Sequence, residues 1–102
     1  MSSPLKNARF LHLTLYVADS EPNSNTAQQN LREVCSEEQA DQCHIEIVDV
    51  YKDFERALTE RIIVTPTLIV SREGSDSKIV FFGSLQDKST LIKYLQMRSE
   101  NE

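Results

Sequence analysis

The fold is decided by the stretch Thr65-Pro66-Thr67-Leu68-Ile69-Val70, in which a proline stands immediately before a run of apolar residues. A short apolar run of this kind predicts a buried strand over residues 67–70. A second apolar run follows at residues 78–82, and the polar segment 72–77 between the two runs contains Gly74. Because a glycine among polar residues suits a tight connection, we expect the two strands to form an antiparallel hairpin.

Two further strands are predicted before this stretch. Residues 10–17 alternate between apolar and polar side chains, with the period of two that a half-buried strand shows. This strand carries Leu11, Leu13, Leu15 and Val17 on one face and His12, Thr14 and Tyr16 on the other. Residues 43–50 are rich in β-branched side chains and predict the other strand.

Three amphipathic helices are predicted between and after the strands. Pro22 suits the first turn of a helix that follows the first strand. Apolar residues then recur three and four positions apart, as on one face of a helix. They are Ala27, Leu31, Val34 and Cys35, followed by Glu38, in the first helix; Phe54, Ala57, Leu58 and Ile62 around the second, over residues 52–61; and Leu91, Ile92, Leu95 and Met97 in the third, which Asp87 would cap.

The resulting order is β-α-β-α-β-β-α, which resembles the thioredoxin-like fold with a mixed sheet. At 102 residues the chain forms one domain, residues 1–102, with residues 1–8 and 99–102 expected to be flexible. An X-Pro bond is cis in only about 5–6% of cases in folded proteins. The thioredoxin-like scaffold has a cis-proline at this location, which makes Pro66 a structural cis-proline candidate.

The charge and hydropathy of the chain exclude several classes of function. Eleven Lys and Arg against sixteen Asp and Glu leave a net charge of −5, which repels nucleic acid and anionic lipid. The longest apolar run, Ile79 to Phe82, is far shorter than the roughly 20 residues of a membrane helix. The first residues carry no apolar signal region. We therefore expect a cytoplasmic protein with neither a nucleic-acid nor a membrane partner.

The cysteines do not match a thiol-disulfide enzyme. Such enzymes place the reactive cysteine at the start of the first helix, where the helix dipole favours the thiolate. Here residues 18–24 contain no cysteine, Cys35 falls late in the helix, and Cys43 starts a strand. A glutathione-type site using Ser20 or Ser24 as a helix-end donor remains an alternative to simple capping.

No metal, cofactor or catalytic site is predicted. The atoms of His12, His44, Cys35 and Cys43 suit a metal, but no close pair has ligand spacing, and the histidines come from different strands. The chain has two glycines, no phosphate-binding loop and no nucleophile motif. We therefore expect a protein that is not an enzyme.

Several motifs together resemble the KaiB family, the small partner of the KaiC ATPase in bacterial clock-like systems. They are Leu15-Tyr16-Val17-Ala18, Pro22-Asn23-Ser24, Val48-Asp49-Val50, Arg61 to Leu68, and Gly83-Ser84-Leu85. The resemblance implies a non-catalytic, cytoplasmic regulator that binds a KaiC-type hexameric ATPase and modulates its phosphorylation or ATPase cycle, in a clock-like or stress-response system. It also implies partner-binding roles for Tyr16, Arg61, Gly83 and Ser84.

The resemblance leaves two alternatives open. Some members adopt a second, ground-state fold with the order βαββααβ, often tetrameric, so a homo-oligomer, dimer or tetramer, is also expected. Residues 71–78 lack the consecutive prolines of the family, and Ser84 replaces its aspartate. The alternative function is a divergent thioredoxin-fold module without KaiC binding that acts in stress adaptation.

Overall fold

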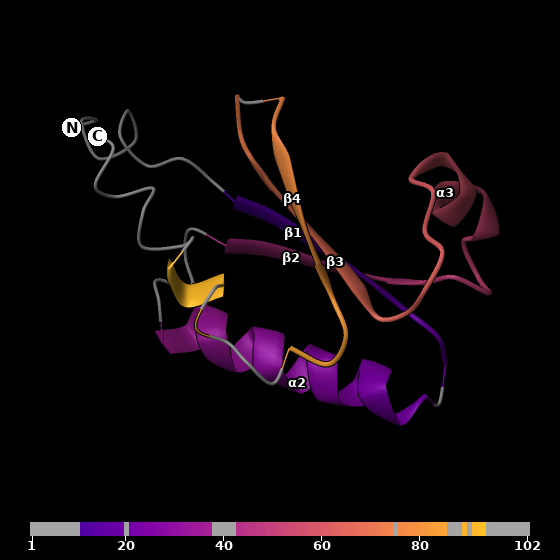
Figure 1. The fold of residues 1–102 in the computed structure, drawn as a ribbon, viewed down its shortest axis with the longest axis horizontal. Helices are drawn as coiled ribbons and strands as arrows, with labels where there is room; N and C mark the ends of the chain where they lie inside the picture. The colour runs from indigo at the N-terminus through magenta and orange to yellow at the C-terminus, as the bar shows by residue number, and fades with distance from the viewer. Residues whose placement is uncertain are drawn as a thin grey trace.

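The computed structural model describes residues 11–19, 21–37, 43–74, 76–85, 89 and 91–93. Along the chain its elements are β1 (Leu11–Val17), α2 (Pro22–Glu37), β2 (Cys43–Asp49), α3 (Phe54–Thr59), β3 (Thr67–Arg72) and β4 (Lys78–Phe82). The strands form one sheet in the order β2-β1-β3-β4. Strand β1 is parallel to β2 and antiparallel to β3, which is antiparallel to β4. Helix α2 lies along one face of this mixed sheet, and α3 lies at one end of it (Figure 1).

This arrangement confirms the predicted order and differs from the ground-state alternative. That alternative requires helix in the segment after Leu68, whereas β3 continues as strand through Arg72. Thr67 to Ser71 pair in register with Phe82 to Lys78, and Gly74, at φ 84°, lies in the connection. The left-handed backbone at this position favours glycine, because it has no Cβ to clash.

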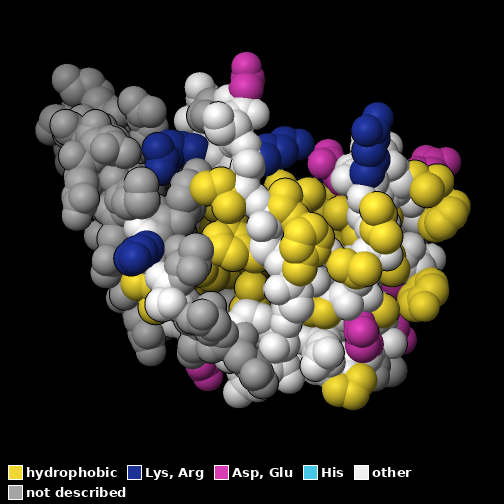
Figure 2. All heavy atoms as spheres, in the orientation of Figure 1, with side chains coloured by type: hydrophobic (Ala, Val, Ile, Leu, Met, Phe, Trp, Pro, Cys, Tyr) yellow, Lys and Arg dark blue, Asp and Glu magenta, His cyan; other side chains and the backbone are white. Residues whose placement is uncertain are grey.

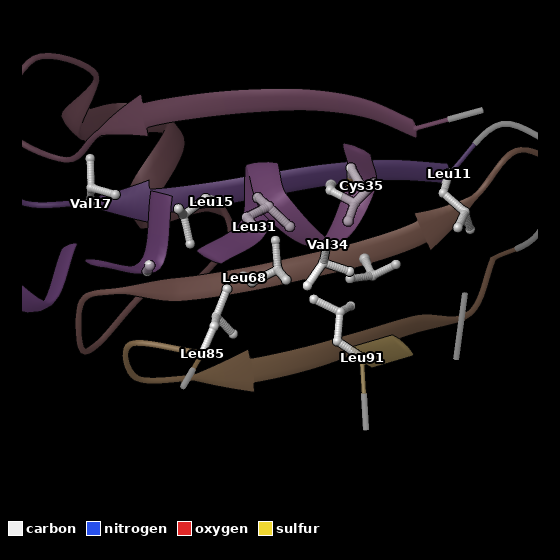
Figure 3. Close-up of a cluster of buried hydrophobic side chains, with 12 residues drawn as sticks. Leu11, Leu15, Val17, Leu31, Val34, Cys35, Leu68, Leu85 and Leu91 are labelled. Atoms are coloured by element: carbon white, nitrogen blue, oxygen red, sulfur yellow. The ribbon is translucent and has the colours of Figure 1, made fainter. Parts of the chain in front are cut away.

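The hydrophobic core lies between the sheet and α2. Leu11 and Leu15 of β1 point to this face and α2 supplies the opposite wall (Figure 3). Leu13 belongs to the same core, as the period of two predicts. The other members of the core are Val17, Ala27, Leu31, Val34, Cys35, Leu68, Val70, Leu85 and Leu91. Each fully buried leucine contributes about 1.5–3 kcal/mol by removing its apolar surface from water. The core side chains of the sheet and of α2 therefore stabilise the fold by packing against each other.

Helix α3 differs from its prediction in length and orientation. It is six residues long rather than ten, and of its residues only Ala57 is buried. Phe54 and Leu58, expected to face the core, are 61% and 60% exposed. The helix instead turns Arg56 toward Glu46 of β2, where the two side chains pair. A charged contact thus takes the place of the expected apolar one.

The end of the chain supports the third predicted helix where it is described. Ser89 and residues 91–93 are helical, Leu91 is buried in the core, and Ile92 packs against it. Asp87, Leu95 and Met97 lie outside the described residues, as do Glu38 and the terminal segments 1–8 and 99–102. None of the helices in the described part of the chain is long and apolar enough to cross a membrane.

Candidate interaction surface

A network of hydrogen bonds, which we call the polar junction, ties the start of α2 to the segment before β3. The N–H of Ala18 donates to Ser24 Oγ at 3.1 Å, and the Ser24 hydroxyl donates to Glu21 Oε1 at 2.7 Å. The Thr65 hydroxyl donates to the same carboxylate oxygen at 2.9 Å. Both hydroxyls donate to the same carboxylate oxygen, so Glu21 is the centre of this network. Ser24 therefore braces the helix start, and Ser20 lies outside the described residues.

The loop after β4 is tied to the cis-proline turn and to α2. The Thr65–Pro66 peptide bond is cis, and Pro66 is buried. Gly83, at φ 93°, donates its N–H to the Pro66 carbonyl oxygen at 3.0 Å. The Asn30 side chain of α2 donates to the carbonyl oxygen of Ser84 at 2.9 Å. The helix start, the cis-proline turn and the Gly83–Ser84 loop are thus neighbours.

An apolar groove, which we call the β4 groove, opens beside this turn on the sheet face away from α2. It has a volume of about 200 Å³. Its lining residues are Glu60, Arg61, Ile62, Ile63, Thr67, Ile69, Val80 and Phe82. Ile63 is 90% exposed and Phe82 is 68% exposed. Figure 2 shows hydrophobic side chains gathered over the strands and onward toward α3. Contiguous exposed apolar side chains of this kind mark a surface that contacts another molecule.

Arg61 stands at the rim of the β4 groove because of the way α3 ends. The N–H of Arg61 donates to the Leu58 carbonyl at 3.0 Å, and that of Ile62 donates to the Ala57 carbonyl at 2.9 Å. This pair of bonds is a Schellman motif with Arg61, at φ 58°, in its left-handed position. The motif ends the helix and leads the chain into Ile62 and Ile63, which line the groove. The Arg61 side chain is exposed.

Tyr16 lies below the surface rather than on it. Its side chain is only 2% exposed, on the sheet face opposite the core, and Arg56 and Glu46 are its charged neighbours. Burial raises the pKa of the Tyr16 hydroxyl, and the Arg56 guanidinium partly opposes that rise. The structure therefore brings Arg61, Pro66, Gly83 and Ser84 into one region of the surface, while Tyr16 supports α3 from beneath.

Arg56 and Glu46 form a bidentate ion pair between α3 and β2. Arg56 Nη2 donates to Glu46 Oε1 at 2.6 Å, and Nη1 donates to Oε2. These hydrogen bonds lower the pKa of the Glu46 carboxyl, despite partial burial that acts the other way. The Arg56 pKa is raised by the same bonds. The side chains are 37% and 42% exposed, so solvent screens the pair and its net contribution stays below about 1 kcal/mol.

The pH dependence of this ion pair has a definite sign. Because the folded-state pKa of Glu46 is lowered, its carboxylate stabilises the fold above the pKa of the unfolded chain, about 4.3. That contribution is lost as the pH falls through the folded-state value. We expect Glu46→Gln to lower the free energy of unfolding by less than about 1 kcal/mol at pH 7, with the difference from the unaltered protein shrinking as the pH falls into the acid range. Urea unfolding at pH 7, 5, 4 and 3 measures this; a difference that stays constant with pH would contradict it.

The two cysteines lie away from the start of α2. Cys35 is 2% exposed in the core beneath the sheet, and Cys43 begins β2 and is half-buried. In place of a nucleophile, the helix start carries the Glu21 network. The thiol arrangement of thioredoxin-like oxidoreductases is therefore not reproduced here.

A larger hollow, with a volume of about 420 Å³, runs along β2 between the two helices. Its charged lining residues are Asp19, Glu46, Asp49, Lys52, Asp53 and Arg56. Arg56 is already bound to Glu46, and the Asp49 carboxylate accepts the N–H of Tyr51 at 2.8 Å. Because the lining carries both positive and negative side chains, the electrostatic potential of the hollow does not favour an anionic or a cationic ligand.

The sequence did not predict most of the residues that line the β4 groove. Val80 and Phe82 belong to a continuous apolar run, and such a run does not show which side chains face the core. In the sheet, Phe81 packs against the core while Val80 and Phe82 are exposed. The roles of Glu21 and Thr65 were missed as well, because their hydrogen bond joins residues 44 positions apart.

The fold and this surface define a thioredoxin-like domain that replaces the redox cysteines by a hydrogen-bonded brace and exposes an apolar groove. Solved structures agree on the fold. A thioredoxin of Fasciola hepatica matches with a TM-score of 0.70 at 16% identity, covering 92% of this chain and 86% of that one. The N-terminal domain of SasA from Synechococcus elongatus matches with a TM-score of 0.69 at 25% identity, covering 93% and 88%.

Sequence comparison identifies the family. The family model of the KaiB domain matches residues 14–96. The circadian clock oscillator protein KaiB of Trichodesmium erythraeum is 33% identical over 98 residues, 96% of this chain and 90% of that protein. The circadian clock protein KaiB3 of Synechocystis sp. is 42% identical over 57 residues, 56% of each chain. The chain belongs to the KaiB family of circadian clock proteins.

Proposed function

We propose that this protein is a non-catalytic regulator that binds a KaiC-type hexameric ATPase in the cytoplasm and modulates its phosphorylation or ATPase cycle. The observation that carries the proposal is the β4 groove, whose apolar side chains lie exposed beside the cis-proline turn. When a partner covers Ile63 and Phe82, apolar surface is removed from water, and this lowers the free energy of the complex. The membership in the KaiB family supplies the class of partner.

The polar junction gives this surface a fixed shape. Thr65 is held to the helix start through Glu21, and Gly83 is held to Pro66 by a backbone hydrogen bond. A rigid surface loses less conformational entropy on binding than a mobile one, so the anchoring favours affinity. We therefore assign Gly83 and Ser84 to the partner-binding surface through their backbone position, and Arg61 through its side chain.

The proposed function is tested by capture and by titration. Immobilised protein is incubated with native lysate, and the bound proteins are identified by mass spectrometry. We expect a hexameric ATPase of the KaiC type, whose ATPase or autophosphorylation rate changes when the purified partners are mixed. Absence of any such ATPase, or binding without an effect on either rate, would favour the alternative of a stress-adaptation module that does not act on KaiC.

Self-association would use the same apolar side chains. A dimer or tetramer that covers the β4 groove competes with the ATPase for it, since both bury Phe82 and Ile63. Light scattering across a dilution series, with and without the ATPase, measures this competition.

Reversing the charge of Arg61 isolates its contribution to binding. We expect Arg61→Glu to weaken ATPase binding by about 1–3 kcal/mol through loss of an ion pair with an acidic group of the partner. Glutamate meets the same left-handed backbone as arginine, and the side chain is exposed, so the fold should be retained. Calorimetric titration measures the affinity, with circular dichroism as the folding control. Unchanged affinity in a folded variant removes Arg61 from the interface.

A further inference from the structure

Two histidines that are distant in the sequence lie directly opposite each other on the sheet. His12 of β1 pairs in register with His44 of the parallel strand β2. Their ring centroids are 5.6 Å apart, with an interplanar angle of 66°. Both side chains are exposed, on the face away from α2. The separation of the two residues along the chain gave no sign of this pairing, which arises from the parallel register.

The position of the pair is not explained by packing of the core. Leu11 and Leu13, the neighbours of His12 in β1, are fully buried on the other face. Helix α3 covers a different part of the open face, where Arg56 reaches Glu46. Imidazole nitrogen is a common metal ligand, so two imidazoles side by side can bind one shared cation.

The spacing of the rings suits chelation of one ion. With metal–nitrogen bonds of about 2.0–2.1 Å, two imidazoles on a tetrahedral ion have ring centroids roughly 5 Å apart. The observed 5.6 Å is close to that value. The parallel register holds the two residues side by side on neighbouring strands, so the backbone places both imidazoles within reach of a shared ligand.

The donor set selects the kind of ion. Imidazole nitrogen suits zinc, copper and nickel, whereas calcium and magnesium require oxygen ligands. Glu46, the next residue on this face of β2, is held by Arg56. Among the described residues no group of three or more histidine, cysteine, aspartate or glutamate side chains gathers around one point. Solvent water would therefore fill the remaining coordination positions.

We propose that His12 and His44 form an exposed two-histidine chelate for a late first-row divalent ion of the nickel, copper and zinc group. The site lies on the open face of β1 and β2, away from Pro66 and Gly83, and is independent of ATPase binding. Because its outer positions carry exchangeable water, the ion can also accept a ligand from a second molecule.

Titration of the untagged protein with nickel chloride tests the chelate. Ni²⁺ is chosen because it favours imidazole and its paramagnetism broadens NMR signals of nearby nuclei. We expect one ion per chain, with broadening centred on the amides and imidazoles of His12 and His44. Replacing either ligand, in His12→Thr or His44→Thr, should weaken binding by about 100-fold, because the second nitrogen then no longer acts in an intramolecular chelate.

The substitutions are chosen to keep the fold. Threonine is favoured in strands, and circular dichroism verifies that each variant is folded. Lys93→Thr, at an exposed position outside the sheet, is the matched control and should leave nickel affinity unchanged. If the unaltered protein does not bind nickel, if either histidine variant binds as tightly, or if broadening centres elsewhere, the chelate is refuted.

Discussion

Replacing Leu15 by alanine should lower the free energy of unfolding by about 2–5 kcal/mol, the range for deleting a fully buried leucine side chain. Leu15 is 0% exposed and lies in β1, which has paired strands on both sides. Its neighbours in register are Ile47 of β2 and Leu68 of β3, so the cavity would be walled by two strands that are fixed by backbone hydrogen bonds. Such walls collapse poorly into a cavity. Urea unfolding monitored by circular dichroism measures the change.

The matched control for this prediction is Leu58→Ala. It removes the same atoms from a side chain that is 60% exposed, and should change the free energy of unfolding by no more than about 0.5 kcal/mol. Domains of this size have total stabilities of about 5–15 kcal/mol, so the Leu15 substitution could remove a large part of the total. Equal effects of the two substitutions would show that the core is not centred on β1.

The sequence predicted the fold well where a periodic pattern extends along a long strand or helix. The alternation in β1 and the helical stripe of α2 each placed the same residues in the core that the structure does. Both patterns extend over several repeats, so one residue that departs from the pattern does not change which face is assigned to the core. The hairpin of β3 and β4 was predicted from Gly74 and its polar neighbours, because a left-handed position has few suitable residues.

Helix α3 shows where such patterns fail. Six residues make fewer than two turns, so an apolar pattern there does not fix which side faces the sheet. The helix ends in a local Schellman motif at Arg61, and its Arg56 pairs with Glu46 of β2. The first depends on the left-handed backbone of one residue and the second on a distant strand, so an apolar pattern shows neither. The same reason accounts for Tyr16, whose burial depends on α3 and could not be inferred from the alternation in β1.

The candidate surface was predicted in part. The sequence singled out Pro66 as a cis-proline candidate and the resemblance singled out Gly83 and Ser84 for partner binding; in the structure the Gly83 N–H donates to the Pro66 carbonyl oxygen. The apolar component was missed, because a continuous apolar run does not show which of its side chains are exposed, and Val80 and Phe82 are 44% and 68% exposed.

Introducing a charge into the β4 groove should have the largest effect on binding. We expect Phe82→Asp to weaken binding to the KaiC-type ATPase by about 2 kcal/mol or more, roughly 30-fold, as for an aromatic residue at the centre of an interface. Covering the new carboxylate with an apolar partner surface costs desolvation free energy. Phe82 is 68% exposed in the isolated chain, so the substitution exposes no core and the fold should persist. Calorimetric titration against the purified ATPase measures the affinity.

Phe54→Asp is the matched control for the groove. Phe54 is the same type of residue with nearly the same exposure, 61%, but it begins α3 and does not line the groove. An aspartate at a helix start is also favourable to the helix, so this variant should fold and bind as the unaltered protein does. A loss of affinity confined to Phe82→Asp, with both variants folded by circular dichroism, places the partner on the β4 groove. If both variants bind normally, the groove is not the contact surface; if both lose affinity equally, the partner covers the whole face from β4 to α3, and the groove is only part of a wider interface.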